Sequence, residues 1–133
     1  MSNFSADISK WAGKAEKDFE RLRRAGIIEL FSSVILDTPV DEGRLRGNWQ
    51  ISSSAPASGV VDILDPQGGK TTANVRQLAA KGKMGEDQVV FLTNNLPYAY
   101  AIEYDGASHT KAPEGMVRKN FIRVSQNLKR NLI

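Results

Sequence analysis

The side chains best suited to catalysis are few: one histidine, and four carboxylates that could gather around a metal ion. His109 stands in a polar segment, and one histidine supports neither a histidine-containing zinc cluster nor a triad with a second histidine. Ser108 beside it lies in no nucleophile-elbow pattern. Cysteine is absent, which excludes thiolate metal sites and a cysteine nucleophile. We therefore expect His109 to be an exposed loop residue and the chain not to be an enzyme.

The carboxylates raise one catalytic alternative, a magnesium-dependent nuclease. They are Asp62, Asp65, Glu103 and Asp105. Carboxylate oxygens hold the ions of two-metal nucleases, but no lysine accompanies them in a recognisable pattern. The run Gly68-Gly69-Lys70-Thr71 is similar to the end of a phosphate-binding loop, yet the glycine spacing upstream is wrong, so a flexible hairpin tip is expected. We expect no metal and no cofactor.

Composition indicates one ordinary globular domain. The 133 residues match a single domain, and 41% hydrophobic with 25% charged residues is typical of soluble proteins. No apolar run approaches the roughly 20 residues of a membrane helix, and the first thirty residues show no signal-peptide pattern. The net charge of +3 hides a local excess of +5 from Lys111 onward. A basic terminal helix of this kind can bind nucleic acid or an acidic partner surface, or its basic side chains can simply face solvent.

The N-terminal third has the periodicity of a helix. Its apolar stripe, at spacings of three and four residues, consists of Phe4, Ile8, Trp11, Ala15, Phe19 and Leu22. Between Ile27 and Ile35 apolar residues cover most of the circumference, which predicts the buried half of the helix. Thr38-Pro39 ends the helix, because a residue before proline is pushed out of the helical region.

The length of this helix predicts a projecting arm. A helix from Asn3 to Leu36 would measure about 50 Å, whereas a compact domain of this size spans roughly 35–40 Å. We therefore expect residues 1–25 to form a helical arm whose Trp11 and Phe19 need a partner chain to cover them. Self-assembly follows as an expectation.

The middle of the chain alternates as strands do. Strands are predicted at 48–53, at 59–64 and at 88–93, the last continuously apolar as a central strand would be. A short helix is expected at 71–81, and 98–104 suits either a helix or a strand.

A closing helix is expected from Pro113, with Glu114 at the positive end of its dipole. Its predicted buried stripe is Val117, Phe121, Val124, Leu128 and Leu132. The expected fold is α+β in one domain over residues 1–133. A long N-terminal helix and a C-terminal helix would pack on one small, mostly antiparallel sheet.

The segment 38–49 reads TPVDEGRLRGNW and carries two closely spaced arginines. Asp41 followed by Gly43 favours a tight turn after the helix. Arg44 and Arg46 are predicted to emerge on one side of an extended segment that continues into the strand of Trp49. Their expected ion-pair partners, within the subunit or across an interface, are Glu103 and Asp41. The segment therefore has either a fold-determining or an interface role.

Two further segments, NNLPYAYAIEY at 94–104 and KAPEGMV at 111–117, follow this one in order. Together the three resemble a tail-component family of lambda-like siphophages and their prophage relatives. That family reads TPVDTGRLR-x-SW, N-x-x-PYA-x-x-x-E-x-G and AP-x-GM, after a long N-terminal helix. Here Glu42 replaces the usual threonine, and Asp105-Gly106 replaces the glycine after the glutamate–aromatic pair.

The resemblance implies a non-catalytic tail-completion or neck protein of the virion, assembled in host cytoplasm as a ring, usually a hexamer, that joins tail to head. The implied partners are further copies of the chain, the tail tube or tail terminator protein, and head–tail connector proteins. DNA would pass through the ring without sequence-specific binding, and no membrane is involved. The alternative is a nucleic-acid-binding module that uses the basic C-terminal helix. Residues expected at interfaces or in fixing the fold are Trp11, Phe19, Asp41, Gly43, Arg44, Arg46, Trp49, Tyr98, Glu103, His109 and Lys111, with the polar loop 105–111.

Overall fold

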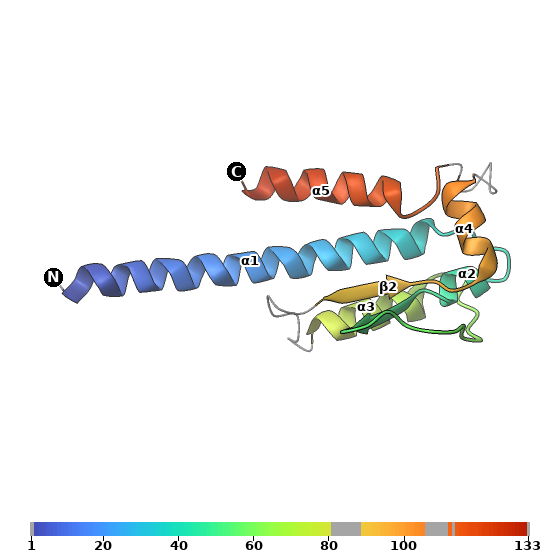
Figure 1. The fold of residues 1–133 in the computed structure, drawn as a ribbon, viewed down its shortest axis with the longest axis horizontal. Coiled ribbons are helices and arrows are strands. Elements are labelled where there is room, and N and C mark those ends of the chain that lie inside the picture. The colour runs from blue at the N-terminus through green and yellow to red at the C-terminus, as the bar shows by residue number, and fades with distance from the viewer. Residues whose placement is uncertain (1, 81–88, 106–111, 113, 133) are drawn as a thin grey trace.

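One long helix forms the middle layer of the molecule, with a second helix along one side and a sheet with a third helix along the other (Figure 1). This computed structural model describes residues 2–80, 89–105, 112 and 114–132. Its elements are α1 Ser2–Asp37, α2 Arg44–Gly47, β1 Gln50–Ser53, α3 Gly69–Ala80, β2 Val90–Thr93, α4 Pro97–Tyr104 and α5 Arg118–Leu132. The fold is α+β, as the sequence predicts.

The first half of α1 projects beyond the rest of the domain. The 36 residues of α1 correspond to a length of about 54 Å. Figure 1 shows its N-terminal half continuing past the end of α5 and past the sheet. There Trp11 is 72% and Phe19 60% exposed, whereas Val34 and Ile35 near the other end are almost fully buried. In the part of the chain that the structure describes, no helix combines the length and apolarity needed to cross a membrane.

The core lies at the C-terminal end of α1. Helices α1, α2, α3 and α4 and the segments that connect the elements each contribute side chains to it. The buried members are Val34, Ile35, Leu45, Trp49, Val75, Ala99 and Met116. Partly buried residues packed around them include Ile28, Phe31, Ile51 and Leu92. One end of α1 is thus enclosed while the other end is left without cover.

The sheet has two antiparallel strands in the described residues, with Gln50 opposite Thr93 and Ser53 opposite Val90. The prediction of a strand at 59–64 is wrong, because no backbone ladder forms there. Side-chain amides instead take up the polar backbone groups of this segment. The Asn48 Oδ1 atom accepts from the Val61 N–H at 2.9 Å, and Gln50 Nε2 donates to the Gly59 carbonyl at 3.0 Å. The strand predicted at 88–93 as a central strand is β2, which in the described residues pairs with β1 alone.

The remaining elements follow the prediction with two corrections. The helix expected at 71–81 is α3, and the ambiguous segment 98–104 is the helix α4, with Pro97 in its first turn. The closing helix begins at Arg118 and not at Pro113, which lies outside the described residues; Glu114 sits in the preceding turn. Phe121, predicted to be buried, is 58% exposed. Contrary to the prediction, the apolar residues of α5 are therefore not all on its buried face.

Deleting residues 1–18 should leave the free energy of unfolding nearly unchanged, because the described side chains of this stretch bury little surface in the core. Urea unfolding of the dilute protein, followed by circular dichroism, measures this. A deletion that continues through Ile28 serves as the control and should destabilise strongly, because Ile28 packs against the core. A large loss with the shorter deletion would mean that the arm stabilises the domain.

Candidate functional site

Segment 38–49 closes the end of α1 by a chain of buried hydrogen bonds. The Trp49 Nε1–H donates to Thr38 Oγ1 at 2.7 Å, and the Thr38 hydroxyl donates to the Val34 carbonyl at 2.7 Å. A buried indole needs a partner for its N–H, and Thr38 supplies it while also accounting for one of the last helix carbonyls. The tryptophan therefore fixes the path of the chain after the helix.

Arg46 binds main-chain carbonyls from two segments. Its Nη2 atom donates to the carbonyls of Leu36 at 2.8 Å and Thr38 at 2.9 Å, and its Nη1 atom donates to that of Pro66 at 2.7 Å. A cation is favourable at this negative end of the helix dipole. Burial lowers the pKa of Arg46, and the carboxylates of Asp65 and Asp37 oppose that shift.

The two arginines do not lie as predicted. They belong to the short helix α2 and not to an extended segment, and Arg44 pairs with Asp62 at 2.8 Å, with both side chains largely exposed. An exposed pair of this kind contributes little. Within the subunit the expected pairing with Asp41 or Glu103 is wrong, because Arg44 pairs with Asp62 and Glu103 pairs with Arg118. Pairing across an interface stays a prediction.

The turn before α2 does require a glycine, as predicted. Gly43 has a φ of 89°, and a Cβ atom there would come within 2.4 Å of the Pro66 nitrogen. The Gly43 carbonyl accepts hydrogen bonds from the N–H groups of Gly47 and Asp65. The turn therefore joins α2 to the segment that leads into α3.

Asp65 occupies the N-terminus of α3. Its Oδ2 atom accepts from the Thr71 N–H at 2.8 Å and from the Thr71 hydroxyl at 2.7 Å. Burial alone would raise the pKa of Asp65, but these hydrogen bonds outweigh it and lower the pKa. The expectation of a flexible hairpin tip at 68–71 is therefore wrong: this stretch leads into the first turn of α3, and Asp65 binds the Thr71 N–H group there.

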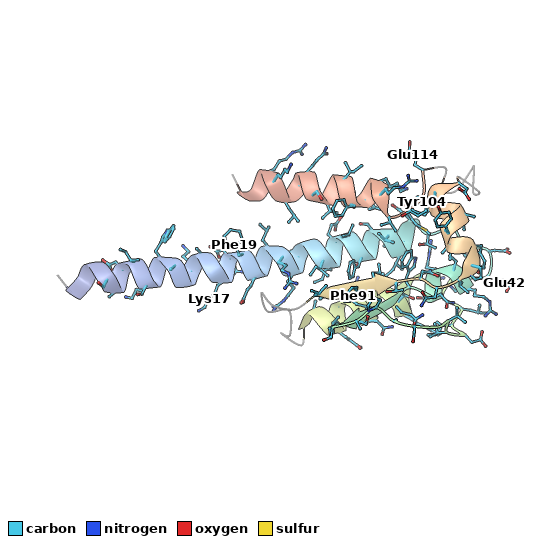
Figure 2. All side chains as sticks on the ribbon, in the orientation of Figure 1. Lys17, Phe19, Glu42, Phe91, Tyr104 and Glu114 are labelled. Atoms are coloured by element: carbon cyan, nitrogen blue, oxygen red, sulfur yellow. The ribbon has the colours of Figure 1, made fainter. Side chains whose placement is uncertain are left out.

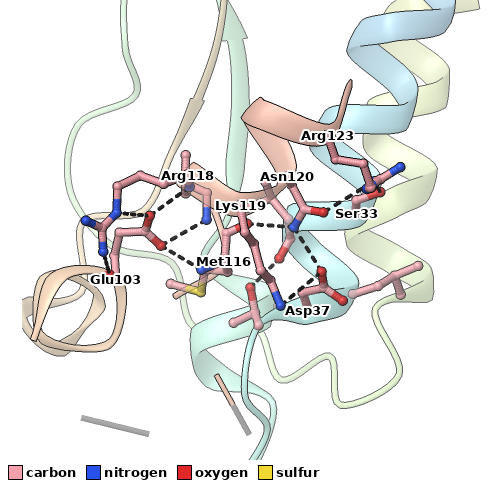
Figure 3. Close-up of polar contacts among 12 residues, drawn as sticks. Ser33, Asp37, Glu103, Met116, Arg118, Lys119, Asn120 and Arg123 are labelled. Atoms are coloured by element: carbon pink, nitrogen blue, oxygen red, sulfur yellow. Dashed lines mark hydrogen bonds and ion pairs between the residues drawn. The ribbon is translucent and has the colours of Figure 1, made fainter. Parts of the chain in front are cut away.

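Glu103, which belongs to α4, binds backbone N–H groups at the N-terminus of α5 (Figure 3). Its Oε2 atom accepts from the N–H groups of Met116 at 2.6 Å and Val117 at 2.9 Å, and its Oε1 atom accepts from that of Arg118 at 2.8 Å. Gly115 makes room, because a Cβ atom there would lie 2.4 Å from Oε2. Burial would raise the pKa of Glu103, yet the hydrogen bonds from these backbone groups and from the Arg118 guanidinium lower it.

Basic residues of α5 pair with the carboxylates of α1 beside it (Figure 3). Arg123 Nη1 lies 2.9 Å from Glu29 Oε1, and Lys119 Nζ lies 3.5 Å from Asp37 Oδ2. The Asn120 amide also donates to Asp37, at 2.9 Å. Much of the basic charge that suggested nucleic-acid binding is therefore balanced within the chain.

The predicted site residues are not brought together at one place. In residues 2–80, 89–105, 112 and 114–132, no group of three histidine, cysteine or acidic side chains is placed to hold a metal ion. Asp62, Asp65 and Glu103 serve an ion pair and two helix caps. His109 and Lys111, and with them most of the loop 105–111, lie outside the described residues.

Large apolar side chains are exposed on α1, α4 and α5. In addition to Trp11 and Phe19 on the arm, aromatic rings are exposed on α4 at Tyr98, Tyr100 and Tyr104, and on α5 at Phe121. The Tyr100 and Tyr104 ring centroids lie 4.7 Å apart, and the Arg118 guanidinium lies 4.8 Å from the Tyr104 centroid. Sequence reasoning missed the roles of Asn48, Asp65 and Phe121. An acidic residue shortly before a helix was an available signal for Asp65 alone.

Replacing Thr38 with valine should cost about 1–3 kcal/mol, because it leaves the buried Trp49 N–H unpaired. A cycle of Thr38→Val, Trp49→Phe and the double variant, measured by urea unfolding, isolates the interaction. The double variant should lose less stability than the two single variants together, since the phenylalanine has no N–H to satisfy. Strict additivity would contradict the hydrogen bond.

Glu103→Gln should destabilise the domain by about 2 kcal/mol at neutral pH, since the amide replaces an acceptor oxygen by a donor facing N–H groups. Because folding lowers the pKa of Glu103, its contribution is present above the ordinary value of 4.5 and is lost as pH falls through the lowered value. Unfolding free energies of wild type and variant should therefore converge in acid. Glu114→Gln is the matched control and should have no effect. A gap unchanged in acid would contradict the charged cap.

Comparisons with protein-family models, with curated proteins and with solved structures found no match. In the described residues, Asp65 and Glu103 bind the starts of α3 and α5, Asp62 forms an exposed pair with Arg44, and Asp105 is exposed. Large apolar side chains are exposed on the first half of α1 and on α4 and α5. Such surfaces suit contact with other proteins.

Proposed function

We propose that this chain is a structural subunit of a tailed bacteriophage, which completes the head-proximal end of the tail and joins it to the head by assembling into a ring. The observation that carries the proposal is the uncovered half of α1. Trp11 and Phe19 stand on a helix that extends past its own domain, with 72% and 60% of their surfaces exposed. Large apolar groups in such a position favour a partner chain.

The three segments that resemble the tail-component family support this role through what they do in the fold. The first closes α1, the second provides Glu103, and the third provides the N–H groups that Glu103 binds. Asn94 of the second segment also donates to the Leu45 carbonyl of the first, at 2.8 Å. The shared residues are therefore those of a rigid frame, as expected of a family whose members build assemblies and perform no catalysis.

The nucleic-acid-binding alternative is less well supported. Arg118, Lys119 and Arg123 on α5 pair with carboxylates of their own chain. Lys129 and Arg130 at the end of α5 are exposed, but two cations provide few of the phosphate contacts that nucleic-acid binding uses. We expect weak DNA binding without sequence preference, consistent with DNA that passes through a ring.

Tail tubes that lack this subunit provide the functional test. Purified wild-type protein should bind to them, form a ring at one end visible by electron microscopy, and make them competent to join heads. The variant Trp11→Ser/Phe19→Ser should fold normally and fail, because both side chains are exposed. Lys10→Ser/Lys17→Ser, on exposed residues away from the apolar stripe, is the matched control and should succeed. A protein that stays monomeric and never binds tail tubes would contradict the proposed function.

A further inference from the structure

The face of α1 that contacts α5 continues without interruption along the projecting arm. In the covered half, Gly26, Glu29, Ser33 and Asp37 meet α5: a Cβ atom on Gly26 would lie 3.1 Å from Leu128, and the other three bind Arg123, Asn120 and Lys119. Residues three or four positions apart lie on the same face of a helix, so counting back from Gly26 in such steps gives the residues of this face on the arm. The residues reached are Leu22, Phe19, Ala15, Trp11 and Ile8. Figure 2 shows Phe19 on the α5 side of α1 and Lys17 on the other.

An acid followed by an apolar residue recurs on this face every eleven residues, which is close to three helical turns. The three pairs are Asp7-Ile8, Asp18-Phe19 and Glu29-Leu30. In the last pair, Glu29 binds Arg123 of α5 at 2.9 Å and Leu30 packs against the core. The first two pairs are exposed. The arm thus repeats the acidic residue that binds α5 at Glu29, each time followed by an apolar residue, where α5 no longer covers the helix.

The outer side of α5 offers the complementary chemistry. Phe121 and Ile122 are 58% and 57% exposed. Lys129 is exposed and lies seven residues after Ile122, hence on the same side of the helix. We call Phe121, Ile122 and Lys129 the α5 shoulder, and Ile8, Trp11 and Phe19 with Asp7 and Asp18 the arm stripe. The arm stripe is apolar with two aspartates, and the α5 shoulder is apolar with a lysine.

We propose that the arm stripe of one copy docks on the α5 shoulder of a second copy. Apolar burial drives the contact, since aromatic side chains bury about 150–250 Å² each, and the opposite charges set its register. In a parallel, in-register pair of arms, Asp7 would instead face Asp7 and Asp18 would face Asp18.

This contact joins two different surfaces, and such a contact closes into a ring or grows into a filament. The inference therefore deepens the proposed function, on which it rests, by naming the surfaces that would build the ring. Each subunit would donate an arm to one neighbour and receive an arm from the other. The two-surface contact makes a prediction that a symmetric contact does not.

Mixing two defective variants tests it by light scattering. The arm variant is Trp11→Ser/Phe19→Ser and the shoulder variant is Ile122→Glu, all at exposed positions, with folding checked by circular dichroism. Wild type should form a defined oligomer at high micromolar concentration, and each variant alone should associate at least about tenfold more weakly. An equal mixture should form a heterodimer, because it restores one intact contact. The variant Lys17→Glu, on the face opposite Phe19, should assemble as wild type does.

Several outcomes would overturn the docking. A shoulder variant that assembles normally, or that forms dimers through its intact arm, would assign the arm stripe to another surface. A mixture without heterodimer would exclude the two-surface contact, and so would a wild-type chain that stays monomeric. In each case the tail-tube experiment still judges the proposed function separately, because a ring could be built through other surfaces.

Discussion

The guanidinium of Arg46 holds the carbonyls of Leu36, Thr38 and Pro66, and the rest of the fold depends on where it places them. A helix end leaves carbonyls without partners, and here one cation accounts for one of them while fixing the next two segments of chain. Because the chain is held at that point, Trp49 reaches back into the core to Thr38, and β1 starts in the correct place to pair with β2. Lysine could not replace this arginine, since one ammonium group lacks the fork that spans three acceptors.

Two carboxylates likewise bind backbone groups at the ends of other helices. Asp65 holds the start of α3, and Glu103 holds the start of α5 from α4. Hydrogen bonds lower the pKa of both groups against the effect of burial, so both stay charged near neutrality. In many enzymes perturbed carboxylates mark a catalytic site; here they account for helix termini. The consequence is that hydrogen bonds join the starts of α3 and α5 to other segments of the chain at the end of the molecule opposite the arm.

The sequence predicts features set by local pattern and misses those set by distant contacts. The long helix and its stop at Thr38-Pro39 follow from periodicity and proline geometry. The exposed arm follows from the length of that helix, which exceeds the diameter of a compact domain of this size. The strand expected at 59–64 fails because the side-chain amides of Asn48 and Gln50 bind that segment's backbone, which no periodicity reveals. Glu103 was singled out as a partner for an arginine of the first segment, but it binds Arg118 and the N-terminus of α5. The eleven-residue recurrence along α1 is present in the sequence, yet it gains meaning only once α5 is seen to cover its last copy.

One end of α1 is enclosed by its own domain, and we propose that a neighbouring copy covers the other end. Amide hydrogen exchange, followed along α1 at low and high protein concentration, measures this most directly. Amides from Gly26 to Asp37 should be protected at both concentrations. Amides from Ser5 to Glu20 should exchange rapidly in the dilute protein and become protected on assembly. An arm that is protected in the dilute monomer, or that still exchanges rapidly in the assembled protein, would contradict this proposal.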